Sequence, residues 1–87
     1  MIDKLDTGTC FTWDLRGKEN SVFKIIDIDN RSHPGECQIL EVQYKGDNLK
    51  LETSWRLKSG IKAMGEEIPD FQFNESLKHV FDYYKSL

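Results

Sequence analysis

Apolar residues at every second position mark several segments of this chain as β-strands. In residues 9–15 the large apolar side chains fall at Phe11, Trp13 and Leu15, with polar or small residues between them. This is the two-residue period of a half-buried strand. The same period runs through residues 37–45 and 49–57, so the pattern predicts strands at 9–15, 37–45 and 49–57.

Residues 22–29 are rich in β-branched side chains, but their alternation breaks. Phe23 and Ile25 share one parity, whereas Val22, Ile26 and Ile28 share the other. Either this strand is central and buried on both faces, or an extra residue near Ile25 and Ile26 forms a β-bulge that returns the large side chains to one face. We favour the bulge, because small and strongly curved sheets need such bends.

The stretch "VQYKGDNLKLETSW", residues 42–55, predicts a tight β-hairpin. If Gly46 and Asp47 form the loop, Tyr44 lies opposite Leu49, Val42 opposite Leu51 and Leu40 opposite Thr53, and the apolar side chains share one face with Trp55. A turn centred on Asp47 and Asn48 shifts the pairing by two residues and preserves the faces. The pattern therefore predicts the hairpin and leaves its register open.

The segment after Leu57 contains two glycines and a proline within fourteen residues, too many for a long helix. It allows a single helical turn at 61–64, and "FQF" at 71–73 could add a short fifth strand. Asn74 is a good helix N-cap. From there apolar residues recur at spacings of three and four, predicting an amphipathic helix at 75–86 whose inner face carries Leu77, Val80, Phe81, Tyr84 and Leu87.

Together these elements predict one α+β domain over residues 1–87. Four to five antiparallel strands follow one another as a meander, the sheet is strongly curved, and the C-terminal amphipathic helix packs on it. The order of strands, with a hairpin and then a helical turn before the last short strand, resembles that of SH3-like small barrels. The resemblance is one of topology and carries no function. Open sheet and closed barrel both remain consistent with the pattern.

Composition places the chain among soluble globular domains, with 38% hydrophobic and 31% charged residues. The start, "MIDKLDTG", has acids where a secretory signal has a basic and then an apolar stretch, so we expect a cytoplasmic protein that does not enter a membrane. In that reducing compartment Cys10 and Cys37 are expected to be free thiols, packed as small buried hydrophobic residues.

Several chemistries lack the residue spacing that they require. His33 and Cys37 are four apart, but Cys10 and His79 have no near partner, so the paired ligands of a zinc site are missing. Asp27 and Asp29, two apart on one face, could hold Mg²⁺, but a strand end that enters a polar turn has the same sequence. The "PD" at 69–70 resembles the start of a restriction-type nuclease motif, but no acid-x-lysine follows it. Because phosphate-binding loops and nucleophile elbows are also missing, we expect no catalytic residues, metal or cofactor, and a small enzyme or metal-dependent nuclease ranks last.

Charge is distributed unevenly along the chain. The net charge is −3, but the segment 45–62 is +3 because its basic residues outnumber Asp47 and Glu52. A nucleic-acid-binding small barrel using this segment is therefore an alternative function. Glu41 and Glu52 share the hairpin's polar face and would oppose phosphate. The candidate binding residues here are Lys45, Lys50, Arg56, Lys58 and Lys62.

The first-ranked hypothesis is a non-catalytic protein-binding module: a small adaptor, subunit or inhibitor of a larger protein, of the kind that mobile elements also encode. Aromatic residues are plentiful, and Trp, Tyr and Arg are enriched at the centres of protein interfaces. Tyr83 lies off the helix's main apolar stripe and, with His79, is expected to be exposed. An edge strand, either the first or the short fifth, offers strand addition or a homodimer.

Overall fold

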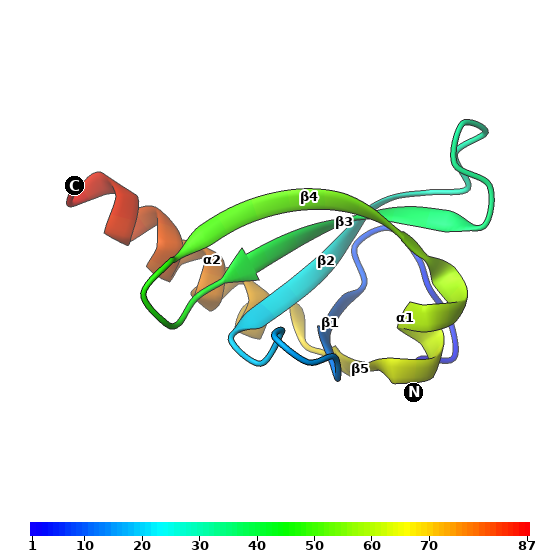
Figure 1. Cartoon of the computed structure of the whole chain (residues 1–87), viewed down its shortest axis with the longest axis horizontal. Helices are drawn as coiled ribbons and strands as arrows, with labels where there is room; N and C mark the ends of the chain where they lie inside the picture. The colour runs from blue at the N-terminus through cyan, green and yellow to red at the C-terminus, as the bar shows by residue number, and fades with distance from the viewer.

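The computed structural model describes all residues 1–87 as a five-stranded antiparallel sheet with two helices (Figure 1). The predicted α+β class and the meander of strands are confirmed. The order across the sheet is β4-β3-β2-β1-β5, and the sheet is not closed. The elements are β1 (Cys10–Trp13), β2 (Ser21–Ile28), β3 (Glu36–Gln43), β4 (Lys50–Leu57), α1 (Lys58–Met64), β5 (Gly65–Ile68) and α2 (Asp70–Lys85).

The order of elements is that of SH3-like barrels, with α1 as the helical turn between β4 and β5. Because the sheet stays open, the likeness is loose. The edges are β4 and β5, whereas β1 lies inside the sheet between β2 and β5. The expectation that the first strand is an edge is therefore wrong. After α1 the chain returns beside β1, where Cys10 pairs with Ile68 and Trp13 with Gly65.

The fifth strand and the start of the C-terminal helix differ from the prediction. Residues 71–73 form the first turn of α2 rather than a strand, and the strand is the acidic segment "GEEI" just before them. The helix cap is Pro69, in extended conformation, and not Asn74. Asp70 then stands in the first turn, where the helix dipole favours a negative charge.

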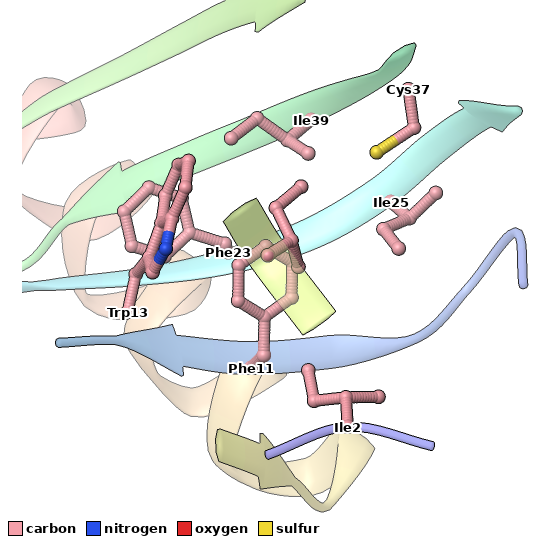
Figure 2. Packing of buried hydrophobic residues seen from close by; sticks show 8 residues of the cluster. Ile2, Phe11, Trp13, Phe23, Ile25, Cys37 and Ile39 are labelled. Atoms are coloured by element: carbon pink, nitrogen blue, oxygen red, sulfur yellow. The ribbon is translucent and has the colours of Figure 1, made fainter. Parts of the chain in front are cut away.

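One face of the sheet encloses an aromatic core (Figure 2). The rings of Phe11 and Phe23 stack with centroids 5.2 Å apart. Trp13 meets each of them edge to face, at 6.1 Å and 5.8 Å, an arrangement that aromatic pairs prefer. Around the three rings pack the buried side chains of Ile2, Ile25, Cys37, Ile39 and Ile61.

The other face of the sheet is covered by α2. Phe73 and Val80 of the helix are buried against Cys10, Val22 and Val42 of the strands. The hairpin's predicted apolar face belongs to this cluster, since Leu40, Tyr44, Leu49 and Leu51 pack around it. Both sheet faces are therefore core over the central strands.

Strand β2 has both of the features that its sequence allows, a β-bulge and burial on two faces. The pairing with β3 shifts register between Ile25 and Asp27, which confirms the β-bulge. The bulge leaves Ile26 exposed and brings Ile28 to the aromatic core, on the face of Phe23 and Ile25. Val22, however, packs under α2. The strand is thus both bulged and buried on two faces.

The hairpin has the register expected for a loop at Gly46 and Asp47. Leu40 lies opposite Thr53 and Val42 opposite Leu51, and the ladder ends at Gln43 and Lys50. Gly46 has a positive φ of 94°, which glycine adopts without steric cost. The Tyr84 hydroxyl of α2 donates a hydrogen bond to the Leu49 carbonyl oxygen at 2.8 Å, fastening the helix to the hairpin loop.

The junction of α1 and β5 leaves no room for a side chain at Gly65. A Cβ there would lie 2.5 Å from the Ile61 carbonyl oxygen and 2.9 Å from Ile2 Cδ1. We expect Gly65→Ala to lower the free energy of unfolding by about 1–3 kcal/mol, as overpacking does. Chemical denaturation measures this.

Gly60→Ala in α1 is the matched control. The nearest atom to its Cβ would be Trp13 Cζ2 at 3.8 Å, an ordinary contact. Because alanine favours helix by up to about 1 kcal/mol over glycine, this variant should be as stable as the native chain or more so. Equal losses of unfolding free energy in Gly65→Ala and Gly60→Ala would contradict the steric clash at Gly65.

Candidate functional site

The hairpin's polar face is not simply solvated. On β3 the side chains of Cys37, Ile39 and Glu41 point to the same face of the sheet, and Cys37 and Ile39 belong to the aromatic core. Glu41 is only 4% exposed. Its carboxylate accepts hydrogen bonds from Lys18 Nζ at 2.9 Å and from the Ser21 hydroxyl at 2.8 Å. Glu41 therefore ties the loop before β2 to the sheet.

Burial by itself raises the pKa of the Glu41 carboxyl. Hydrogen bonds from Lys18 and Ser21, with the positive charges of Lys18 and Lys50, outweigh burial, so the pKa of Glu41 lies below its ordinary value. A carboxyl whose pKa is lowered on folding stabilises the folded state above its unfolded pKa. This contribution is lost as pH falls through the lower, folded-state pKa.

Glu41→Gln should lower the free energy of unfolding at neutral pH by about 1–3 kcal/mol, the cost of a damaged buried hydrogen-bond network. The difference from the native chain should hold down to the ordinary glutamate pKa of 4.5 and shrink below it. Urea denaturation across an acid pH series measures both. Glu52→Gln is the control, because Glu52 is exposed and its loss should cost under about 0.5 kcal/mol. If the difference in stability between Glu41→Gln and the native chain does not change with pH, the lowered pKa of Glu41 is refuted.

The five predicted basic residues do not form one surface. Lys50, at the start of β4, donates to Glu52 at 3.1 Å, and this hydrogen bond raises the pKa of Lys50. Lys58 pairs with Asp29 at 3.0 Å, beyond the other end of the strand. Lys45 Nζ lies 5.3 Å from the centre of the Tyr44 ring. Lys62 is exposed on α1.

Arg56, the fifth of these residues, takes part in the structure's pocket. This tryptophan pocket has a volume of about 360 Å³ and is lined by Trp13, Leu15, Glu36, Trp55, Arg56, Leu57 and Gly60. The Arg56 guanidinium lies 5.8 Å from the centre of the Trp13 ring, within cation–π range. Trp55 stacks flat on His33, with ring centroids 3.7 Å apart. Nothing in the local sequence pattern indicated that Trp55 and His33 meet.

The other predicted contacts, His79 and Tyr83, are both exposed and lie one turn apart on α2. Phe81 and Leu87 were expected to face inward, but they are 47% and 82% exposed. Phe81 lies about 100° around the helix from Val80, away from the buried stripe of Phe73, Leu77 and Val80. Tyr84, also expected to face inward, is 42% exposed.

The last turns of α2 extend past the hairpin end of the sheet (Figure 1). The helix face that packs on the sheet at Val80 therefore continues without cover. At about 100° per residue, Tyr83 and Tyr84 stay within about 60° of the direction of Val80. We call the exposed residues here the helix patch: Tyr83, Tyr84 and Leu87.

The two cysteines are free and buried, as expected, and they lie in different clusters on the two sheet faces. Burial, then the hydrogen bond that the thiol donates to Asp70 at 3.5 Å, raises the pKa of Cys10 to about 11. Burial also raises the pKa of Cys37. Since the thiolate is the nucleophilic form, both thiols are poor nucleophiles at neutral pH.

Native Cys10 should therefore react with iodoacetamide about 100-fold more slowly than a free thiol, because a pKa of about 11 against 9.0 lowers the thiolate fraction by that factor. Mass spectrometry of the alkylated chain at neutral pH measures the rate at each cysteine. The same chain in concentrated urea is the control and should react at the free-thiol rate. Rapid alkylation of native Cys10 would contradict the burial of its thiol and its raised pKa.

No group of three or more His, Cys, Asp or Glu side chains is placed to hold a metal ion. Asp27 accepts a hydrogen bond from Asn30 Nδ2, and Asp29 is engaged by Lys58. No helix has the length and apolarity to cross a membrane. A scan against protein-family models and searches of curated proteins and of solved structures each found no match. Function must therefore be argued from the tryptophan pocket and the helix patch.

Proposed function

We propose that this protein is a non-catalytic protein-binding module, an adaptor, subunit or inhibitor of a larger protein, which it contacts through the helix patch. The observation that carries the proposal is the uncovered continuation of α2's packing face. Tyr83 is 38% exposed, Tyr84 42% and Leu87 82%. Large apolar side chains gathered on one exposed surface are a mark of protein interaction sites.

The composition of the helix patch suits an interface. Two of its residues are tyrosines, which supply large contact area at a low cost in side-chain entropy and are enriched among the residues that dominate binding energy. The rings of Tyr83 and Tyr84 lie 5.7 Å apart, and the Tyr84 hydroxyl is already bonded to Leu49. The patch is therefore held in place before a partner arrives. His79 adds a polar group beside Tyr83.

Two further features of the partner follow. A surface of aromatic and aliphatic side chains fits a partner that presents an apolar groove. We place the encounter in the cytoplasm, since two unpaired cysteines suit a reducing compartment. A homodimer through an edge strand is the alternative, and β4 or β5 would supply the edge.

The nucleic-acid alternative has less support. Of the five basic residues proposed for it, Lys50 and Lys58 are engaged by carboxylates and Arg56 lies against Trp13. Lys45 and Lys50 are near one end of β4, and Arg56 and Lys58 are near the other. A strand of this length is roughly 25 Å long, so the cations do not form a continuous track for phosphates.

A photo-crosslinking amino acid tests the proposal. Placed at position 83 in the cells that make the protein, it should give one adduct of discrete mass with another protein. Placed at Glu75, which is exposed on the outer side of α2, it should not. With the partner in hand, Tyr83→Ala and Leu87→Ala should each weaken binding about tenfold or more. Their effect on stability should stay small, because both side chains are partly exposed.

Glu75→Ala is the matched control and should leave affinity unchanged. The absence of a position-specific adduct at 83 would refute binding through the helix patch. An adduct of twice the chain's mass would replace the larger partner with a second copy of this chain bound at the helix patch.

A further inference from the structure

We propose that the tryptophan pocket, together with the open edge of β4, binds an extended peptide segment that carries a large apolar side chain next to a carboxylate. This inference rests on the proposed function, in that the ligand is a polypeptide. It concerns a surface separate from the helix patch and defines what that surface recognises.

The shape and lining of the pocket suit an apolar side chain. Its volume of about 360 Å³ is at the lower end of the range for ligand sites. Trp13, Leu15 and Leu57 supply apolar walls, and Leu57 is 62% exposed. At Gly60 the wall is bare backbone. An isobutyl or aromatic side chain would bury this surface.

A buried donor in the wall has no partner. Trp13 is only 8% exposed, and its indole Nε1 makes no hydrogen bond. Nε1 and Cζ2 are bonded to the same ring carbon, and Cζ2 is the atom nearest to a Cβ built on Gly60, at 3.8 Å. The N–H edge of the indole therefore lies on the side of the pocket wall at Gly60. Buried N–H groups nearly always have an acceptor, and a carbonyl or carboxylate oxygen of a ligand would supply it.

Arg56 supplies a charged group at the same place. Its guanidinium is held by the Trp13 ring, and its Nε donates to the Ser54 hydroxyl at 3.4 Å. No ion pair engages it. The planar fork of a guanidinium matches a carboxylate. Glu36 also lines the pocket, and its carboxylate lies 3.6 Å from His33 Nδ1.

The backbone beside the pocket is ready for an added strand. β4 pairs only with β3, so one of its sides is open. Along a strand of an antiparallel pair, the backbone N–H and C=O groups of one residue bond to the neighbouring strand, and those of the next residue point away from it. The Lys58 N–H donates to the Gly35 carbonyl oxygen. By alternation Arg56 and Ser54 also bond toward β3, and the N–H and C=O groups of Trp55 and Thr53 point to the open side. A peptide paired there runs directly past the pocket.

Charge selects an acidic peptide over a basic one. Arg56 lines the pocket without an ion pair, whereas Lys58, which follows on the chain, is paired with Asp29. The unpaired guanidinium favours glutamate or aspartate next to the apolar side chain, and disfavours lysine there.

The chain contains its own reporter for this test. Its two tryptophans both line the pocket, so intrinsic fluorescence responds to occupancy. The probes are short acetylated and amidated peptides of alternating sequence with a central Leu-Glu, and matched peptides with Leu-Gln or Ala-Glu. Titration should give saturable binding of the Leu-Glu peptide, with the other two about tenfold weaker or more.

Variants of the pocket sharpen the result. Arg56→Gln should weaken the Leu-Glu peptide about tenfold and leave the Leu-Gln peptide unchanged, since the lost interaction is with the carboxylate. Gly60→Ala narrows the pocket without disturbing the fold and should weaken both. Lys62→Gln, which removes an exposed positive charge outside the pocket, is the matched control and should change affinity less than twofold.

Two outcomes would overturn the inference: no binding of the Leu-Glu peptide up to about 1 mM, or equal binding of it by the native chain and Arg56→Gln. Tyr83→Ala separates the two proposals, because it should keep peptide binding while losing the partner cross-linked at the helix patch. If the native chain binds no peptide while the cross-linker at position 83 still gives its adduct, the pocket proposal alone is overturned.

Discussion

The sheet of this small protein is apolar on both faces, and each face needs a cover. β2 shows the constraint most directly, since Phe23 and Ile25 project to one side and Val22 to the other, and all three are buried. On one side the curvature of the sheet, with Ile2 and Ile61 brought in from outside it, encloses the aromatic core. On the other side α2 lies across the strands. The β-bulge, α1 and the early start of α2 all serve this double coverage.

Elements with a strong local pattern could be predicted from the sequence. Alternation located β1, β3 and β4, β-branched composition located β2, and the turn chemistry at Gly46 agreed with the hairpin's register. The short fifth strand could not be located, because "GEEI" has no apolar alternation and is a strand through its backbone pairing with β1. Pro69 and Asp70 were a usable signal for the start of α2, since a proline before a first-turn acid often opens a helix.

The candidate sites show the same division. Exposure of His79 and Tyr83 followed from helical periodicity, which depends on neighbours in the sequence. Burial of Glu41 did not follow, although Ile39 two residues earlier shares its parity and points into the aromatic core. The tryptophan pocket could not be predicted at all. It joins Trp13 of β1 to Trp55 of β4 and Gly60 of α1, and no local pattern reports contacts at such separations.

The position of β1 between β2 and β5 also has a consequence for how the chain folds. The hairpin of β3 and β4 closes a short loop, but β1 meets β5 only after nearly the whole sheet has been traversed. Pairings between segments so distant in sequence are slow, because the entropy of closing a long loop is lost before the contacts form. On the ribosome, β1 is made first and its second neighbour almost last. Until Ile68 has emerged, Cys10 and Phe11 have an unpaired edge, which a chaperone or a second nascent chain can occupy.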